Sequence, residues 1–472
     1  MKYLKCTLLF ALIALVSSCE EGYLEPAPKS VISSANYYTT PEQVESAVIN
    51  IYDGIQGVWD FGMDENRAIQ LEYYLTEMRS DNTRTKSSEG EAAQFESYSV
   101  EATNGIVANY YQSYYNVIFR ANVVLENLGA AGNMAAKFEA EAKFLRAYAY
   151  FNLVRLYGDI PLVDCVISPE DKSTAYTRVA TTEVYDLIAS DLNTAINGLD
   201  NSSSYRASKA AAQTLLAKVH LNRGDYLEAQ QLCESIVGSG NYVLEANFKD
   251  VFYNEGNGEV IFAIGYIGDS DEAQNFSPEW LNAVGRTSGV NYVTNDAKAA
   301  LDAMGGDRTM YSYRNDVSQT TQNQVAKYIP NGDSALGIVA TSTDPQKAGN
   351  DWVVLRYADV LLLHVESILA GGASTSSAAA LSSFNLIRSR AGLADDADGT
   401  ITKQELMDER RVELAFENHR LFDLMRMGEA QNVLSAFATS VGVDFSSSDL
   451  LLPIPQREIN LSNGAMSQNP GY

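Results

Sequence analysis

The chain lacks most of the patterns that mark an enzyme or a nucleic-acid-binding protein. No HExxH, GxxxxGK[ST], GxSxG or CxxC motif occurs in its 472 residues. Its three histidines, His220, His364 and His419, each stand alone, and the first two fall inside helical patterns that indicate a structural role. Basic residues are few, 34 against 60 acidic ones, and the net charge of −26 repels nucleic acid and anionic lipid. The sequence therefore predicts no cofactor and no nucleic-acid partner. A glycosidase stays open, because it needs only two carboxylates.

Cysteine is also scarce, and one of the four cysteines carries a strong signal. Lys2 and Lys5 precede an apolar run of about ten residues, which is the length of a signal-peptide core rather than of a membrane span. The run ends in Val-Ser-Ser-Cys19, which resembles a bacterial lipobox, where the cysteine becomes the first mature residue and carries lipid. We predict a signal peptide at 1–18 and a lipid anchor on Cys19. The alternative is an ordinary cleaved signal with an incidental cysteine.

The residues after the signal contain no apolar stretch of 18 or more, so no transmembrane helix is expected there. Glu20 and Glu21 resemble the acidic export tag of some surface lipoproteins, or are simply solvated acids of a tether. Cys165 and Cys233 could pair in an oxidising compartment. Cys233 falls on an apolar helical face, which favours a buried free thiol.

Hydrophobic periodicity predicts a mainly all-α fold of stacked helix pairs, a tetratricopeptide-like superhelix. In the pair 207–221 and 226–237, Gly224, Tyr226 and Ala229 stand where such repeats place a turn glycine, an aromatic and a small packing residue. One pair cannot bury its own apolar face, so several must stack. The other predicted helices are 41–56 with Thr40 as its cap, 136–157 with a polar side that includes Glu141 and Arg146, 353–369 and 376–391.

This pattern fails between about 241 and 351, where Gly, Asn, Ser and Thr surround one short predicted strand, 259–266. Loops this long in a folded protein are usually functional or disordered. We therefore expect one compact domain with an N-terminal region, 19–240, and a C-terminal region, 241–472, that contains a loop-rich insertion and a few short strands.

Two charged segments look functional at first sight. The segment 394–405 aligns with a calcium-binding loop through Asp396, Asp398 and Glu405, but Ala394 replaces the first ligand, so an acidic interhelix loop is the default reading. In the segment 409–426, charges recur three and four residues apart, as in Arg410 with Glu413, Glu417 with Arg420 and Asp423 with Arg426. That spacing predicts structural ion pairs along one helix face.

Seven blocks in order resemble the SusD/RagB family of outer-membrane nutrient-binding lipoproteins. They begin with Tyr23-Leu-Glu-Pro26 and Tyr38-Thr-Thr-Pro41, and they end with Leu452-Pro-Ile-Pro455 and Gln468-Asn-Pro-Gly-Tyr472. Between these lie segments 115–122, 141–162, 386–393 and 409–424, among which the run from Glu141 to Leu162 is the most recognisable. The resemblance covers nearly the whole mature chain. Tyr111 stands where many members have Trp, and Val365 where many have Ala.

The resemblance implies a non-catalytic, lipid-anchored protein on the outer face of the outer membrane. Such a protein acts as the lid of a SusC-like TonB-dependent transporter and captures oligosaccharide or, in some cases, peptide. The tetratricopeptide-like helices would mostly dock the transporter, and the irregular loops would hold the ligand. A surface glycosidase and a purely structural scaffold are the competing hypotheses.

The family's ligand site is variable, so the resemblance assigns no binding residue. Sugar rings pack their apolar faces on flat aromatics, while a few polar groups bond the hydroxyls. The chain has 28 Tyr, and aromatics in irregular segments are better candidates than those on helical faces. Some candidates could instead contact the transporter. With two polar residues of the loop 81–90, the predicted ligand-binding residues are Trp59, Asn82, Arg84, Phe276, Trp280, Tyr292, Tyr311 and Tyr313.

Overall fold

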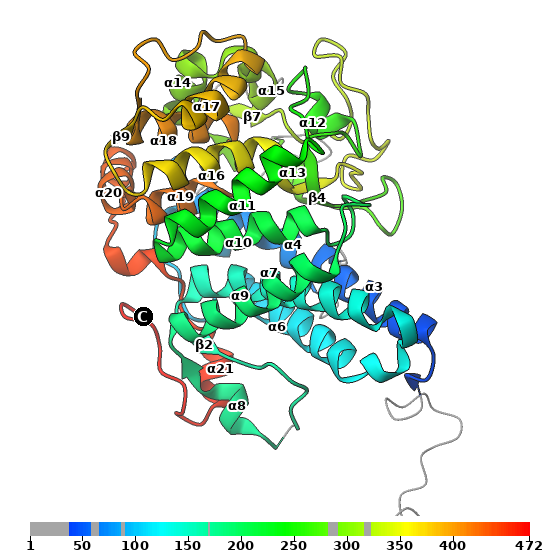
Figure 1. Ribbon diagram of the computed structural model, residues 1–472. Helices are drawn as coiled ribbons and strands as arrows, with labels where there is room; N and C mark the ends of the chain where they lie inside the picture. Colours follow the sequence, from blue (N-terminus) through cyan, green and yellow to red (C-terminus); the bar gives the residue numbers. More distant parts are fainter. Residues whose placement is uncertain (1–36, 58–65, 86–89, 169, 282–290, 316–321) are drawn as a thin grey trace, which may run out of the picture.

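A stack of antiparallel helices forms the body of the protein (Figure 1). The computed structural model describes residues 37–57, 66–85, 90–168, 170–281, 291–315 and 322–472. Each helix of the stack packs on the next one along the chain. In order, these are α6 (Gly105–Glu126), α7 (Ala135–Tyr157), α9 (Thr181–Gly198), α10 (Lys209–Arg223), α11 (Tyr226–Ser239), α16 (Tyr357–Leu369) and α17 (Ala378–Arg390). Helix α3 (Pro41–Gln56) packs on α6, the first helix of the stack. The predicted mainly helical, stacked-pair architecture is confirmed.

Local signals set several helix ends where they were predicted. At the start of α3 the side chain of Gln43 accepts a hydrogen bond from the backbone N–H of Thr40 at 3.1 Å, in a capping box. At the turn between α10 and α11, Gly224 has φ +80°, the left-handed conformation that ends helices at glycine. Ala229 is fully buried, as the close approach of paired helices requires.

Two helix predictions need correction. Residues 353–356 are not helical, because they belong to β8 (Trp352–Arg356), which pairs with β4 (Val260–Ile264). The run of branched and aromatic side chains there fits a strand better than a helix. Two residues of the predicted polar side of α7 are interior. Glu141 is fully buried, and Arg146 forms two bonds of 2.8 and 2.9 Å to Asp191 on α9.

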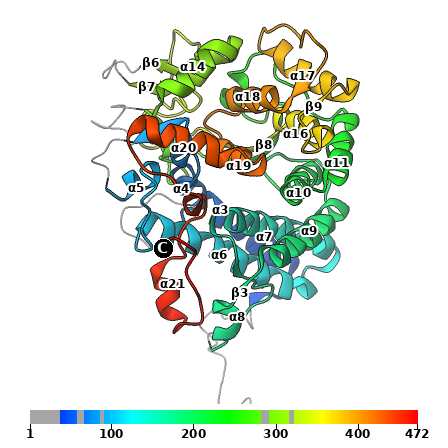
Figure 2. The same cartoon turned by 90° about the vertical axis from the view of Figure 1, so that its left-hand side faces the viewer.

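Three strands of the insertion join one strand of the N-terminal region, β1, in a small antiparallel sheet with the order β1-β5-β7-β6. Its strands are β1 (Thr83–Thr85), β5 (Asn291–Val293), β7 (Asn323–Val325) and β6 (Tyr313–Asn315). In Figure 2 the strands β6 and β7 lie on the opposite side of the molecule from α9, α10 and α11. The two short ladders are β2 (Ile160–Pro161) with β3 (Arg178–Val179), and β9 (Ser374–Thr375) with β10 (Ile401–Thr402).

Shorter helices complete the molecule. They are α4 (Ala68–Leu75), α5 (Ala93–Glu96), α8 (Lys172–Tyr176), α12 (Asp250–Tyr253), α13 (Phe276–Trp280), α14 (Asn295–Met304), α15 (Thr309–Ser312), α18 (Lys403–Glu413), α19 (Arg420–Arg426), α20 (Ala430–Val441) and α21 (Gln456–Leu461). Among the described residues, no helix is both long and apolar enough to span a bilayer. Cys165 is exposed and Cys233 buried, and both are free thiols, so the structure excludes the disulfide alternative.

The segment 409–426 is structural, as predicted, but most of its ion pairs are not the predicted ones. α18 ends at Glu413 and α19 begins at Arg420, because the chain turns between them through positive φ at Phe416 and Asn418. The pair Asp423–Arg426 forms at 2.7 Å. Arg410 instead bonds Asp423 and Asp359, and Arg420 bonds Asp81.

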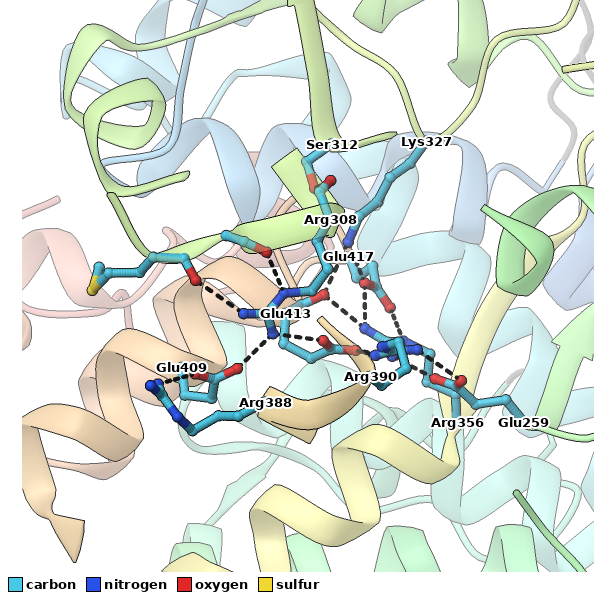
Figure 3. Close-up of polar contacts among 12 residues, drawn as sticks. Glu259, Arg308, Ser312, Lys327, Arg356, Arg388, Arg390, Glu409, Glu413 and Glu417 are labelled. Atoms are coloured by element: carbon cyan, nitrogen blue, oxygen red, sulfur yellow. Dashed lines mark hydrogen bonds and ion pairs between the residues drawn. The ribbon is translucent and has the colours of Figure 1, made fainter. Parts of the chain in front are cut away.

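A buried cluster of charges results, with Glu413 at its centre (Figure 3). The Glu413 carboxylate accepts hydrogen bonds from Arg308 at 2.8 Å, from Arg356 at 2.6 Å and from Arg390. Arg308 lies in the insertion, Arg356 at the end of β8 and Arg390 at the end of α17. The cluster therefore ties the insertion to the helical body.

Candidate ligand-binding site

Arg84 and Tyr292 lie opposite each other on β1 and β5, where the N-terminal region meets the insertion. Both side chains are half-buried, whereas the residues on either side of them in the strands are buried. Since alternate residues of a strand face opposite sides, both side chains point to the outer face of the sheet. Directly opposed cross-strand side chains are neighbours, so a guanidinium and an aromatic ring lie together there.

Glu96 fixes the direction of Arg84. Its buried carboxylate accepts bonds from Nη2 of Arg84 at 3.1 Å and from Nε at 3.4 Å. A bidentate pair of this kind holds the guanidinium plane in one orientation. Burial raises the pKa of the Tyr292 phenol, while Arg84 opposes the rise, so the phenol remains neutral and can donate a hydrogen bond. No local sequence signal singled out Glu96, because its role depends on a turn of α5 folding back onto β1.

Asp81 and its neighbours hold β1 from the inside. Asp81 accepts bonds of 2.8 and 2.9 Å from Arg420, and Arg411 lies 3.0 Å away. Burial alone would raise the pKa of Asp81, but Arg411 and Arg420 lower it to about 2, so the carboxylate stays charged. Thr294 donates its backbone N–H to the carbonyl of Asn82 at 3.0 Å, which joins the end of β5 to the start of β1.

Asn82 is part of this internal support and not of the surface. Only 1% of it is exposed, and its side chain bonds Glu77 and Arg411 at 3.0 Å each. The prediction that Asn82 contacts ligand is therefore corrected, because both ends of its amide are already used inside the protein.

Phe276 and Trp280 are corrected for a similar reason. Trp280 is fully buried and Phe276 is 2% exposed. The Trp280 ring lies 5.3 Å from that of Tyr73, and the Phe276 ring lies 5.3 Å from that of Trp352. The irregular sequence around them suggested a surface loop, but the short helix α13 turns both rings into the core.

Tyr311 and Tyr313 are half-buried, but the structure does not place them beside Arg84. β6, which carries Tyr313, and β1 are the two outer strands of the sheet, about 14 Å apart at the usual strand spacing. The hydroxyl of Tyr313 bonds Asp302 of α14. Trp59 lies outside the described residues. Arg84 and Tyr292 are thus the two predicted residues that the structure brings together.

In the acidic loop 394–405, two of the carboxylates considered as calcium ligands accept hydrogen bonds from the backbone. Asp396 accepts hydrogen bonds of 3.0 Å from the backbone N–H groups of Asp398 and Gly399. Glu405 turns away to cap α18, accepting from the backbone of Thr402 at 2.7 Å. Among the described residues, no group of three or more acidic, His or Cys side chains is arranged to hold a metal ion. The spacing resembled that of a calcium-binding loop, but the carboxylate of Glu405, which would be its last ligand, caps α18 instead.

The sequence is similar to known proteins along the whole chain. The sequence model of the SusD family matches residues 235–472, and a second model, described as starch-binding and associating with the outer membrane, matches residues 23–221. A SusD-like protein of Formosa agariphila is 26% identical over the full length of both chains. The starch-binding protein SusD of Bacteroides thetaiotaomicron is 24% identical over 71% of this chain and 72% of that protein.

Solved structures match the fold closely. Surface glycan-binding protein A from Bacteroides thetaiotaomicron, in complex with laminarihexaose, superposes with a TM-score of 0.76 at 22% identity. The match covers 91% of this chain and all of that one. Because the first family model alone spans half of the chain and the fold agrees over nine-tenths of it, the chain belongs to the SusD family.

Proposed function

We propose that the protein is a cell-surface lipoprotein that binds glycan oligosaccharides and delivers them to a SusC-like TonB-dependent transporter in the outer membrane, without cleaving them. Family membership supports this function, since the family matches include a starch-binding description and relatives named for binding starch or laminarin. The lipid anchor would be Cys19, which lies outside the described residues.

The observation that carries the proposal is the outward-facing pair of Arg84 and Tyr292, backed by Glu96. A tyrosine ring offers a flat apolar surface for the C–H face of a sugar. The guanidinium offers donors to hydroxyl groups of a sugar, and the phenol offers both a donor and an acceptor. Sites for small ligands typically combine an aromatic surface with a few polar groups that converge on the ligand.

Calorimetry on the purified mature protein tests the site. We expect one or more of laminarihexaose, maltohexaose and xylohexaose to bind. In Arg84→Ala and Tyr292→Ala the affinity should fall about tenfold or more, which corresponds to about 1.4 kcal/mol. Tyr313→Ala, on the other edge of the sheet, is the matched control and should bind like the unmodified protein. Equal losses in all three variants would contradict this site.

Peptide capture by the same architecture is the second candidate, and the same calorimetry with a panel of tripeptides to hexapeptides separates the two. Binding of peptides but not of glycans would overturn the proposal. Release of new reducing ends from any bound glycan would instead favour the glycosidase hypothesis.

The anchor has its own test. Cells grown with an alkyne-bearing palmitate should label the protein, and Cys19→Ala should abolish that labelling. Co-purification with a TonB-dependent transporter from detergent-solubilised outer membranes would support the proposed partner.

A further inference from the structure

A groove lies on the surface beside β4, and neither Arg84 nor Tyr292 lines it. Its volume is about 380 Å³, which is the size of a small-ligand site. β4 pairs with β8 along one edge. On the other edge, Ala263 donates its N–H to the carbonyl of Ser204 at 2.8 Å, so the connection between α9 and α10 lies alongside. That connection, the residues after α11 and the turn 256–258 form the walls.

The lining of this groove is uncharged. One residue in five of the whole chain is charged, yet every side chain that the structure places along the groove is neutral. The polar ones are three asparagines, three consecutive serines and two tyrosines. Hydroxyls and amides both donate and accept hydrogen bonds. A lining of this kind suits an uncharged ligand rich in hydroxyl groups and offers nothing to pair with a charged one.

Tyr205 supplies a fixed aromatic surface. Its hydroxyl donates to Asp351 at 2.7 Å, and its ring carbons lie 3.4 Å from the position that a Cβ on Gly265 would occupy. The ring is thus held at its tip and along one side. Nevertheless 39% of Tyr205 remains exposed, so part of the ring is open to solvent beside the groove.

Some polar groups of the groove stabilise its walls, and others are free to contact a ligand. Asn257 donates to the carbonyls of three residues, 250, 251 and 254, and so fixes the turn that forms one wall. Asn241 is exposed, and within the described part of the chain its side-chain amide has no hydrogen-bond partner. Its two donors and its carbonyl oxygen are available to a ligand.

We infer that this groove is a second glycan-contact site, in which Tyr205 stacks on a neutral sugar unit and Asn241 bonds its hydroxyls. The inference rests on the proposed function, because only a glycan-capturing protein brings a sugar chain to its surface. A second contact strengthens binding of a chain long enough to engage both sites, through a raised effective concentration. A short oligosaccharide that fills the first site gains nothing from it.

Native gel electrophoresis through immobilised polysaccharide tests the inference on the mature protein. The probes are laminarin, starch and xylan as neutral polymers, and polygalacturonate as an anionic one. We expect retardation by a neutral polymer and not by polygalacturonate. The double variant Tyr205→Ala/Asn241→Ala should lose at least fivefold in affinity for that polymer, while its calorimetric affinity for the matching hexasaccharide stays unchanged.

Tyr472→Ala is the matched control, because Tyr472 is 37% exposed, donates its hydroxyl to Leu451 at 2.9 Å and lies outside the groove lining. It should run like the unmodified protein. Asn241→Asp keeps the tyrosine, but it introduces a charge and removes both N–H donors of the amide. Its retardation should therefore also fall, even if removal of Tyr205 disturbs folding.

The outcomes separate the two sites. If both groove variants are retarded normally while Arg84→Ala is not, the groove inference is wrong and the proposed function stands. If the unmodified protein is retarded by no neutral polymer, both fail. Retardation by polygalacturonate that the groove variants abolish would also overturn the inference, since it would place a charged ligand in the groove.

Discussion

Arg356 shows how much of this structure depends on single buried charges. It bonds three carboxylates from two distant segments, Glu259 at 2.7 Å, Glu413 at 2.6 Å and Glu417 at 2.7 Å. All four side chains are nearly or fully buried. A buried ion pair adds little net stability over an apolar pair, but a buried charge that has lost its partner is costly.

We therefore expect Arg356→Met to lower the free energy of unfolding by about 3 to 5 kcal/mol. The reason is that carboxylates in the interior lose their main counter-charge. Equilibrium unfolding in urea measures the difference. Lys298→Met, which removes an exposed ion pair with Asp302, is the control and should leave the unfolding midpoint unchanged. Equal effects of the two substitutions would contradict the structural role of the cluster.

At the scale of elements, α7 and α9 show how small residues allow helices to pack closely. Gly198, the last residue of α9, lies directly on α7. A Cβ at this position would come within 2.7 Å of the Cβ of Ala140 and 3.2 Å of the carbonyl of Ala136. Ala140 is fully buried, so it has no room to move aside. The helices can approach this closely because neither carries a large side chain here.

Gly198→Ala should consequently destabilise the protein by about 1 to 3 kcal/mol, the usual range for overpacking. Gly238→Ala, near the end of α11, is a matched control for which we expect the opposite change in stability. A Cβ there meets no atom within 4 Å, so the substitution should stabilise by about 0.4 to 1 kcal/mol. Thermal unfolding of the two variants checks both signs, and a stabilising Gly198→Ala would rule out the close approach.

At the scale of the whole molecule, buried carboxyl groups make stability depend on pH. Burial raises the pKa of Glu77 to about 7, although Asn82 and the backbone N–H of Phe416 donate hydrogen bonds to it. The folded state therefore holds this proton more tightly than the unfolded chain. The resulting stability is fully present below about pH 4.5 and is lost as the pH rises through 7.

Glu77→Gln cannot ionise, so its free energy of unfolding should fall less than that of the unmodified protein between pH 5 and pH 8. The expected difference is roughly 2 to 3 kcal/mol. His419, whose pKa burial lowers to about 3, acts in the opposite sense below pH 6.5. Urea unfolding of both proteins at the two pH values isolates the contribution of Glu77, and parallel pH profiles would show that Glu77 is not buried as described.

The helical body of this protein could be predicted from local sequence patterns. The boundaries of α3 and α7, the pair α10–α11 and its turn at Gly224 all follow from periodicity, capping and glycine, which act within a few residues. The order of the family blocks identified the family for the same reason, because it is a property of the chain alone.

The directions of the side chains in the irregular segments depend instead on contacts between distant parts of the chain. Asn82, Phe276 and Trp280 looked like surface residues, yet they are internal, while Arg84 and Tyr292 are brought together by a strand register across more than 200 residues. The partners of Arg410 and Glu413 were likewise set by contacts between distant elements. Where no repeating local pattern fixes a face, burial depends on which distant segments the chain packs against, and neighbouring residues in the sequence do not carry that information.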